Sequence, residues 1–268
     1  EKCFDELYMV KKDCEEVIFD KIIHIQANLH VDGKLTFKNC KINAQDSYQI
    51  NITSSGVLEF DNCEFSKVRR TEKYLIDSKG KVNFNRCSIY NCWKLVESDG
   101  DVDDNTNDVE VSKSIIKFDN KFAKVKSTGY AFDNTLLTGN LLLVESKVEG
   151  FITSNGKILD LGEDARIFTT LNTCTKCSFI KCGHIFDANH GYNVVESSFY
   201  SCENVFVDTS YNKVVDCDFF NCSYIFYFLC GENTVEKCRF LDCVNQIFFM
   251  SSGAITSFDS CEFRNISQ

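Results

Sequence analysis

Proline is absent from this chain of 268 residues, and tryptophan occurs once, methionine twice and histidine four times. Proline removes a backbone donor, so its absence suits long hydrogen-bonded strand ladders in which every N–H group is needed. No run of about 18 apolar residues occurs, and we therefore expect no transmembrane helix in this chain. The few histidines stand in two distant pairs, which indicates no histidine cluster for metal binding or catalysis.

Positive charge is also in short supply. The chain has 29 Lys and Arg against 39 Asp and Glu, a net charge of −10. A phosphate-binding groove needs clustered Lys and Arg, whereas the basic residues here are dispersed, so we expect no nucleic-acid partner. The chain begins at Glu1 without a signal peptide. We expect a trimmed form, from which an anchor could have been removed.

The chain contains a short sequence unit that recurs many times. The unit C-x-F-x-x-C recurs at steps of 20, 20, 21 and 23 residues. Its five copies start at Cys177, Ser197, Cys217, Cys238 and Cys261. Each unit holds three short apolar runs rich in β-branched and aromatic residues, with polar corners between them, which is typical of strands. A fixed period of this size predicts a solenoid in which each repeat stacks on its neighbours.

Three short strands per turn predict an all-β chain that forms a parallel β-helix, right-handed because such crossovers usually are. We expect about ten to eleven rungs of about 20–24 residues. Residues 1–20 are predicted to be an N-terminal cap with a short amphipathic helix, and residues 21–268 a single solenoid. The rival of similar period, a leucine-rich repeat, needs a leucine signature that this chain lacks.

Equivalent residues of successive rungs should lie about 4.8 Å apart and stack as ladders inside the solenoid. The predicted aromatic ladder is Phe179, Phe199, Phe219 and Phe240. The predicted cysteine ladder residues are Cys177, Cys182, Cys202, Cys217, Cys222, Cys238 and Cys243. We interpret them as buried thiols that fill the core, with a disulfide framework as the alternative. Cys3 and Cys14 are the best candidates for a disulfide.

Residues 97–110 interrupt the repeat and are predicted to be an inserted loop, because seven of these fourteen residues are Asp or Glu. Their oxygen spacing resembles that of an EF-hand loop. The residues in ligand positions are Asp99, Asp101, Asp103, Asn107 and Glu110. The position that should be Gly is Asp104, and no helices flank the loop. A solvated acidic loop is the preferred interpretation, and calcium binding is the alternative.

Enzymes that cleave polysaccharides also use the parallel β-helix, so we looked for their residues. A chain without proline cannot carry the R-x-P-x-x-R motif of pectate lyases. A carboxylate row of Glu196, Asp216 and Glu236 is expected on one rung face, but adjacent like charges indicate a solvated surface rather than a catalytic pair. We predict no catalytic residue and no cofactor apart from the calcium hypothesis. Three sequons, at Asn51, Asn221 and Asn265, are glycosylation sites if the chain is eukaryotic and secreted.

The spacing F-x-x-C recurs from Phe179 to Cys182, from Phe199 to Cys202 and in two later copies, and Ser252-Gly253-Ala254-Ile255 occurs once. The chain therefore resembles the polymorphic membrane proteins, pectin-lyase-like β-helical surface proteins built from G-G-A-I and F-x-x-N repeats. It departs from their pattern because the first motif is not repeated and Cys replaces Asn. The resemblance implies surface display and adhesion.

These observations together favour a non-enzymatic cell-surface or secreted protein with an adhesive or structural role. It would bind a protein or glycan through an exposed sheet face, and self-association, end to end or lateral, is also considered. The alternative is a carbohydrate-active β-helix enzyme, either a polysaccharide lyase or a glycoside hydrolase, with diverged catalytic residues. A groove with clustered carboxylates and basic residues would favour the enzyme, and a flat face with aromatics would favour binding.

Overall fold

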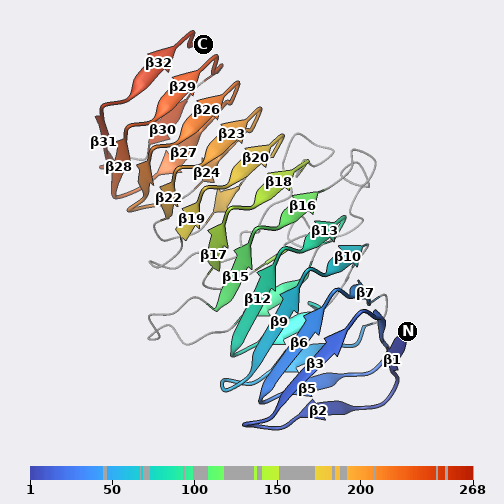
Figure 1. Cartoon of the computed structure of the whole chain (residues 1–268). Helices are drawn as coiled ribbons and strands as arrows, with labels where there is room; N and C mark the ends of the chain where they lie inside the picture. Colours follow the sequence, from blue (N-terminus) through green and yellow to red (C-terminus); the bar gives the residue numbers. More distant parts are fainter. Residues whose placement is uncertain are drawn as a thin grey trace.

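The computed structural model of the chain is a parallel β-helix, with the two termini at opposite ends of the solenoid (Figure 1). The structure describes residues 1–44, 47–66, 68, 73–92, 94–98, 108–117, 136–137, 141–150, 173–182, 185–187, 192–207, 209–245, 247–250 and 253–267. Within these ranges every regular element is a strand, and no helix suited to crossing a membrane is found. The predicted all-β parallel solenoid is confirmed.

Sheet A is the longest of the four parallel sheets and has twelve strands. In order along the solenoid they are β1 (Lys2–Phe4), β4 (Ile22–Ile25), β7 (Lys41–Asn43), β10 (Glu64–Ser66), β13 (Ser88–Tyr90), β16 (Ile115–Lys117), β18 (Lys147–Glu149), β20 (Ser178–Ile180), β23 (Ser198–Tyr200), β26 (Asp218–Phe220), β29 (Arg239–Leu241) and β32 (Glu262–Arg264). In most of these strands the middle residue is buried and its neighbours are more exposed, so the sheet covers the core on one side and presents its other side outward.

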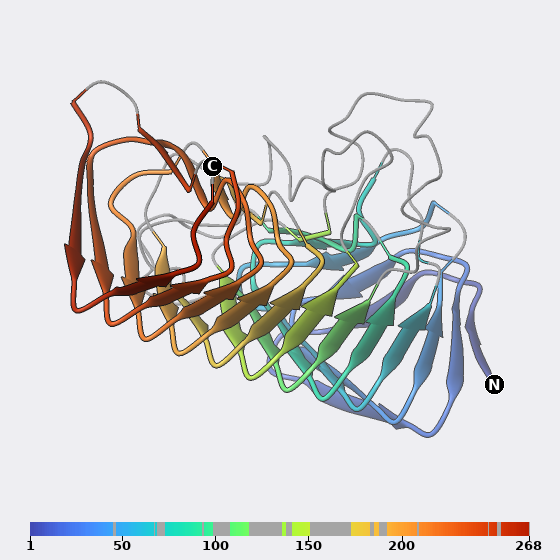
Figure 2. The same cartoon turned by 90° about the horizontal axis from the view of Figure 1, so that it is seen from above.

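Sheet C has eleven strands and precedes sheet A in each turn. Its strands are β3 (Glu15–Phe19), β6 (Lys34–Lys38), β9 (Val57–Asp61), β12 (Lys81–Asn85), β15 (Val109–Ser112), β17 (Leu141–Val144), β19 (Thr173–Thr175), β22 (Asn193–Val195), β25 (Lys213–Val215), β28 (Glu232–Glu236) and β31 (Ile255–Asp259). Figure 2 shows strands of consecutive turns lying side by side along the solenoid.

The third side of the solenoid consists of two shorter sheets. Sheet B has five strands, β2 (Tyr8–Val10), β5 (Leu29–Val31), β8 (Ile50–Ile52), β11 (Ile76–Ser78) and β14 (Val96–Ser98). Sheet D has four strands, β21 (Phe186–Asp187), β24 (Phe206–Val207), β27 (Phe226–Leu229) and β30 (Phe248–Met250). Every strand pair in the four sheets is parallel, as expected when one turn of chain lies directly on the next.

The N-terminal residues form the first turn of the solenoid, so the predicted amphipathic helix within residues 1–20 is wrong. They supply β1, β2 and β3, which pair with β4, β5 and β6. Of the apolar residues that suggested a helix, Phe4 ends β1, Tyr8 and Val10 belong to β2, and Leu7 lies between the two strands. The number of turns differs slightly from the ten to eleven predicted rungs, since sheet A has twelve strands and sheet C has eleven.

One residue with a positive φ makes the corner between sheet C and sheet A in every turn. These eleven residues, which we call the corner row, have φ between 48° and 55°. They are Asp20, Asn39, Asn62, Arg86, Lys113, Glu145, Lys176, Glu196, Asp216, Lys237 and Ser260. A left-handed residue other than glycine costs about 1–2 kcal/mol. Hydrogen bonds to the next turn offset this cost, as where the Glu196 N–H donates to the Val215 carbonyl at 3.0 Å.

The core contains stacked phenylalanines, as predicted. The rings of Phe179, Phe199, Phe219 and Phe240 stack with successive centroid distances of 5.0, 4.7 and 4.9 Å. Sheet D adds a second stack, in which Phe206 lies 4.9 Å from Phe186 and 5.2 Å from Phe226. Each stacked pair joins adjacent turns, so the aromatic core is continuous along this half of the solenoid.

Glycine at the corner before sheet C permits a close approach of adjacent turns. A Cβ atom on Gly80 would lie 2.2 Å from the Gly56 carbonyl oxygen and 2.4 Å from the Thr53 carbonyl oxygen. Both obstacles are backbone atoms of the preceding turn, which cannot rotate away. We expect Gly80→Ala to lower the free energy of unfolding by about 3 kcal/mol, measured by urea denaturation. The adjacent exposed Lys79→Ala should change it by less than about 0.5 kcal/mol; equal effects would contradict this explanation.

Candidate binding face on sheet A

Twelve of the sixteen cysteines form two columns, one at each end of the sheet A strands, and all of these except Cys261 are buried. The first column follows the corner row and contains Cys40, Cys63, Cys87, Ser114, Ser146, Cys177, Ser197, Cys217, Cys238 and Cys261. The second follows sheet A and contains Cys92, Cys182, Cys202, Cys222 and Cys243. The structure thus divides the predicted cysteine ladder between two corners, and the first column includes serines in three turns.

Backbone hydrogen bonds explain why small donors occupy these columns. The Cys217 Sγ lies 3.4 Å from the carbonyl oxygens of both Val215 and Val194, to which it donates. The Cys222 Sγ lies 3.3 Å from the carbonyls of Phe220 and Phe199 in the same way. In each case one carbonyl belongs to the same corner and the other to the preceding turn. The thiols therefore join adjacent turns as well as filling space.

Burial raises the pKa of some of the buried thiols, both in the columns and at Cys174 in β19. Desolvation raises the pKa of Cys174, Cys202 and Cys217 well above the ordinary thiol value, and it raises the pKa of Cys243 to about 11. The thiolate, not the thiol, is the reactive form, so a raised pKa removes the reactive species at neutral pH. The thiols of Cys87, Cys177, Cys222 and Cys238 differ, because a hydrogen bond with a neighbouring thiol lowers the pKa of each.

Thiol counting tests this arrangement. Twelve cysteines are buried, Cys261 is half-buried, and Cys3, Cys14 and Cys230 are exposed. We expect a thiol reagent to react at neutral pH with three to four groups in the native protein and with all sixteen after denaturation. All cysteines lie within the described residues and none is disulfide-bonded there, so the predicted Cys3–Cys14 disulfide is not formed in this structure. Fewer than sixteen thiols in denaturant without reductant would contradict it.

The calcium hypothesis falls mainly outside the described residues, because Asp99, Asp101, Asp103 and Asn107 are not among them. The fifth residue, Glu110, is half-buried in β15. Both ends of the predicted 97–110 loop are strand, since β14 extends to Ser98 and β15 begins at Val109, so the predicted loop boundaries are wrong. In the part of the chain that the structure describes, no group of three or more His, Cys, Asp or Glu is placed to hold a metal ion.

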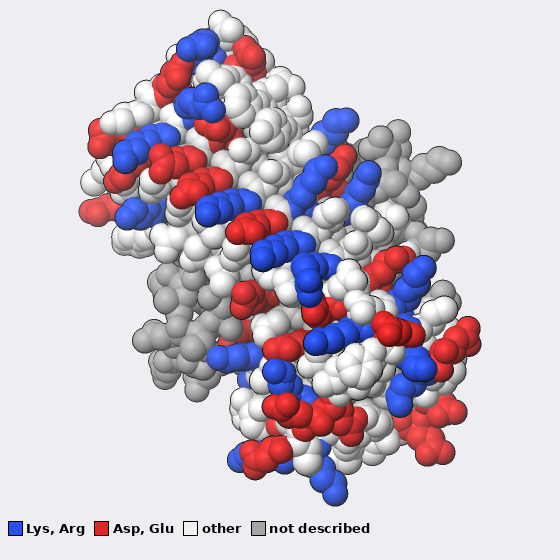
Figure 3. All heavy atoms as spheres, in the orientation of Figure 1, with Lys and Arg blue, Asp and Glu red and all other residues white. Residues whose placement is uncertain are grey.

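The predicted carboxylate row is wrong in its last member. Glu196 and Asp216 occupy successive positions of the corner row, but the next position is Lys237, and Glu236 instead pairs with Val215. The step of 21 residues between these turns shifts the register by one. The corner row therefore carries charges of both signs, and Figure 3 shows a diagonal band of acidic and basic side chains across this face.

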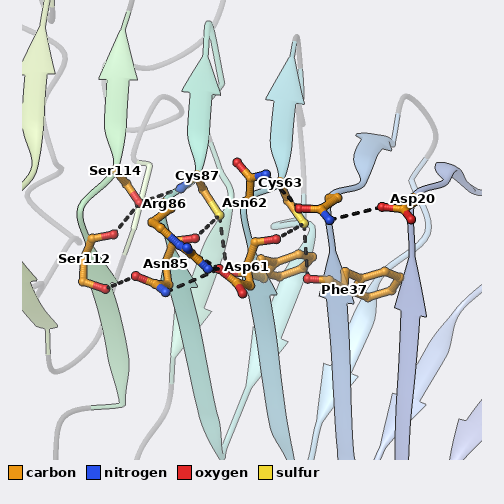
Figure 4. A network of polar contacts seen from close by, with 12 residues as sticks. Asp20, Phe37, Asp61, Asn62, Cys63, Asn85, Arg86, Cys87, Ser112 and Ser114 are labelled. Carbon is orange, nitrogen blue, oxygen red and sulfur yellow. Dashed lines mark hydrogen bonds and ion pairs between the residues drawn. The ribbon is translucent and has the colours of Figure 1, made fainter.

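Asparagine and carboxylate side chains at the N-terminal corners bind one another across turns (Figure 4). The Asn62 amide donates to Asn39 Oδ1 at 2.7 Å, and the Asn39 amide donates to Asp20 Oδ1 at 3.1 Å. Beside them, Arg86 donates from Nε and Nη2 to Asp61 Oδ1, at 3.1 and 2.6 Å. These contacts fix the corners, and they leave the Asp61 carboxylate engaged by an arginine rather than opposed to a second acid.

The predicted glycosylation sites differ in accessibility. Asn51 is half-buried in β8, whereas Asn221 and Asn265 are exposed at the corner after sheet A. The Asn221 amide donates to Ser201 Oγ at 3.2 Å, and the Asn265 amide donates to Asp242 Oδ1 at 3.0 Å. Modification of these three residues stays a prediction.

The outer face of sheet A carries a feature that the sequence analysis missed, an apolar row which we call the outer ladder. It consists of Ile180, Tyr200, Phe220 and Leu241, which are register partners in four consecutive turns. Tyr200 is 40% exposed and the other three are half-buried. Figure 3 shows an uncharged area beside the charged band, in the part of sheet A that holds β20, β23, β26 and β29. The charged residues of these four strands are Asp218 and Arg239. The signal was present, since each ladder residue directly follows a buried Phe and strand side chains alternate.

The outer ladder is ordered by its own contacts. The Tyr200 and Phe220 rings stack at 5.1 Å with an interplanar angle of 9°, and the Arg239 guanidinium lies 5.9 Å from the Phe220 ring centre. Arg239 also donates from Nε and Nη2 to the two oxygens of Asp218, at 2.7 and 2.8 Å. Neighbouring rings and the guanidinium cover the ring faces, so the ladder presents ring edges and aliphatic groups outward.

No protein-family model and no curated protein sequence matches the chain. Among solved structures, the chain is similar to a double mutant of the periplasmic alginate epimerase AlgG, with 9% identity and a TM-score of 0.27, over 94% of this chain and 65% of that chain. It is also similar to ORF18 of Geobacillus virus E2, with 15% identity and a TM-score of 0.24, over 97% of this chain and 52% of that chain. The chain thus spans less than two thirds of either protein.

Similarity at this level carries no argument about activity. The class of protein is defined by the fold itself, a parallel β-helix with internal aromatic ladders. The closer likeness to polymorphic membrane proteins or to the pectin-lyase-like superfamily stays a prediction from the sequence.

Proposed function

We propose that the protein is a non-enzymatic cell-surface or secreted β-helix protein that binds a partner through the outer face of sheet A. The observation that carries this proposal is the outer ladder. In earlier turns the same outward position holds mostly polar residues, such as Asn43, Ser66 and Glu149. Four consecutive apolar residues at one surface position are typical of an interaction site rather than of a purely solvated face.

The ring geometry bears on the kind of partner. A sugar stacks on the flat face of an aromatic ring, but Tyr200 and Phe220 cover each other's faces and Arg239 lies over Phe220. Ring edges and aliphatic groups instead pack against apolar side chains, as they do at protein interfaces. This favours a protein partner over a glycan, within the two classes that the sequence suggested.

Binding is also favoured over catalysis by the state of the acidic side chains beside these faces. Asp218 and Asp61 are each bound by an arginine of the next turn. Glycoside cleavage needs two carboxyl groups facing each other across the scissile bond, about 5–10 Å apart. The surface location rests on the sequence resemblance, and with it the proposed role in adhesion.

An adhesion assay tests the proposal. Beads coated with the protein are added to immobilised proteins and to immobilised acidic and neutral polysaccharides. We expect binding to at least one protein surface, reduced at least about tenfold by Tyr200→Ser combined with Phe220→Ser. The matched control is Tyr211→Ser, because Tyr211 is 69% exposed and lies outside sheet A. Equal binding by the double variant, or depolymerisation of a polysaccharide, would overturn the proposal.

A further inference from the structure

We infer that the outer face of sheet A associates with the same face of a second copy of this chain, through a two-fold axis parallel to the strands. This rests on the proposed function in taking sheet A as the binding face, and it names a partner. The evidence is a symmetry in the pattern of residues over six consecutive turns, from β18 to β32. Such an axis makes the turns of the second copy run in the opposite order, while each residue keeps its position along its strand. Each turn of one copy therefore faces one defined turn of the other.

The apolar residues match under this operation. With the axis between the turns of Tyr200 and Phe220, Tyr200 faces Phe220 of the second copy, and Ile180 faces its Leu241. The outer ladder therefore runs aliphatic, aromatic, aromatic, aliphatic, a sequence that is the same in both directions. Aromatic edges pack on aromatic edges in the centre, with aliphatic groups on either side.

The charges that flank the ladder match as well. The turn before the ladder carries Lys147 and Glu149, and the turn after it carries Glu262 and Arg264. The two-fold axis places Lys147 opposite Glu262 and Glu149 opposite Arg264 of the second copy. Opposite charges thus meet at both ends of the face, which is the arrangement that sets register between partners.

A third complementary pair lies at the corner after sheet A, where Lys181 and Asp242 are exposed and follow the first and last ladder residues. The same operation places Lys181 opposite Asp242 of the second copy. It also places Asp218 and Arg239, which pair with each other, opposite Ser198 and Ser178. No like charges meet across these positions.

The corner row is the exception, since Glu196 would oppose Asp216 and Lys176 would oppose Lys237. These residues lie where the chain turns from sheet C into sheet A, at the rim of the face, and all four are exposed. Water and salt screen charges at a rim. The repulsion there weakens the contact without changing its register.

The size of the face predicts a weak dimer. The face spans six turns that are about 4.8 Å apart, and each turn contributes a strand of three residues with its corners. This corresponds to roughly 400 Å² of surface on each copy. The total of roughly 800 Å² is below that of stable complexes, so we expect a dissociation constant of about 100 μM. A contact this weak becomes effective when many copies are displayed together, which suits the proposed role at a surface.

Sedimentation velocity on the full chain, from about 5 to about 500 μM, tests the inference. The wild type should shift from monomer to dimer across this range. Lys181→Asp alone and Asp242→Lys alone should each associate at least about tenfold more weakly than the wild type, because each replaces two opposite-charge pairs by two like-charge pairs. An equimolar mixture of these two variants should associate as the wild type does, because every facing pair is then opposite in charge. Lys213→Asp, an exposed change on sheet C, is the control and should behave as the wild type.

Two results would overturn the inference: a wild type that stays monomeric up to about 500 μM, or charge variants that do not recover on mixing. Neither result decides the proposed function, since the adhesion assay uses other immobilised proteins. Loss of adhesion in the ladder double variant, with a wild type that never dimerises, would leave the proposed function standing and remove this inference. Dimerisation of the wild type without adhesion to any immobilised protein would support this inference and overturn the proposed function.

Discussion

Raising the pH from 9 to 11 is expected to unfold the protein, because at least three buried thiols must lose their protons as the chain unfolds. Burial raises the pKa of Cys174, Cys202 and Cys217 well above the ordinary value of 9.0. A raised pKa in the folded state means that the stabilisation is fully present below pH 9. It is lost as the pH rises from there through the folded-state pKa.

The size of the effect follows from proton linkage. Each thiol that is protonated in the folded state and ionised in the unfolded state lowers the free energy of unfolding by about 1.4 kcal/mol per pH unit. Three such thiols lower it by about 4 kcal/mol per unit, against a total of about 5–15 kcal/mol for a typical domain. Urea denaturation at pH 7.5 to 10.5, with a reductant present, measures the slope.

The chain supplies its own control for this experiment. Ser197 occupies the same column as Cys217, is buried, and donates to the Val195 carbonyl at 3.0 Å. Cys217→Ser combined with Cys238→Ser, its neighbouring thiol, should therefore remove the coupled pair and keep small hydrogen-bond donors in the column, so that the slope above pH 9 falls by about 1.4 kcal/mol per pH unit. A free energy of unfolding that stays level to pH 10.5 would mean that thiolates are tolerated inside, contrary to the burial of these columns.

The fold was predictable because its signal is repeated. A single C-x-F-x-x-C unit carries little information, but recurrence at steps of 20 and 21 residues places Phe199 and Phe219 in one column whatever the detailed structure of the corners. Hydrophobic content at a two-residue period then assigns the inside of each strand. The length of the repeat and the alternation of side chains along each strand are therefore enough to predict the ladders. The stacked rings of Phe199 and Phe219 agree with this prediction.

Features without repetition were less predictable. Residues 1–20 offered only a few apolar residues, whose spacing suits a helix as well as two short strands, and pairing with the next turn decided in favour of strands. The error at Glu236 has a related cause, since one extra residue in a turn moves every later position by one. Register depends on corner length, which the motif spacing constrains only to within a residue.

The outer ladder is less evident in the sequence than the core columns. Ile180, Tyr200, Phe220 and Leu241 each stand one residue after a ladder Phe, and parity alone puts them outside. In a sequence, an apolar residue next to another apolar residue suggests that both are buried in the core. The exposed fraction of Tyr200, at 40%, agrees with the outward position, whereas ring stacking occurs in both the inner and the outer ladder.

Phe219 and Phe220 allow the two ladders to be separated in one strand. Phe219 is fully buried and stacks between Phe199 and Phe240, at 4.7 and 4.9 Å. Phe219→Ala should lower the free energy of unfolding by about 4 kcal/mol, because it removes the ring and leaves a cavity between two turns that cannot close. Phe220 lies on the outer face, half-buried, so Phe220→Ala should cost less than about 1 kcal/mol.

The binding readouts should show the opposite order. Phe220→Ala removes the centre of the outer ladder and should abolish adhesion and self-association while the far-ultraviolet circular dichroism stays that of the wild type. Phe219→Ala, measured at a temperature where it remains folded, should retain both, because the outer face keeps its register with β23 and β29. Equal losses of stability would mean that the two sides of sheet A are not distinct. Equal losses of binding in folded protein would mean that the outer ladder is not the contact surface, since only Phe220 reaches it.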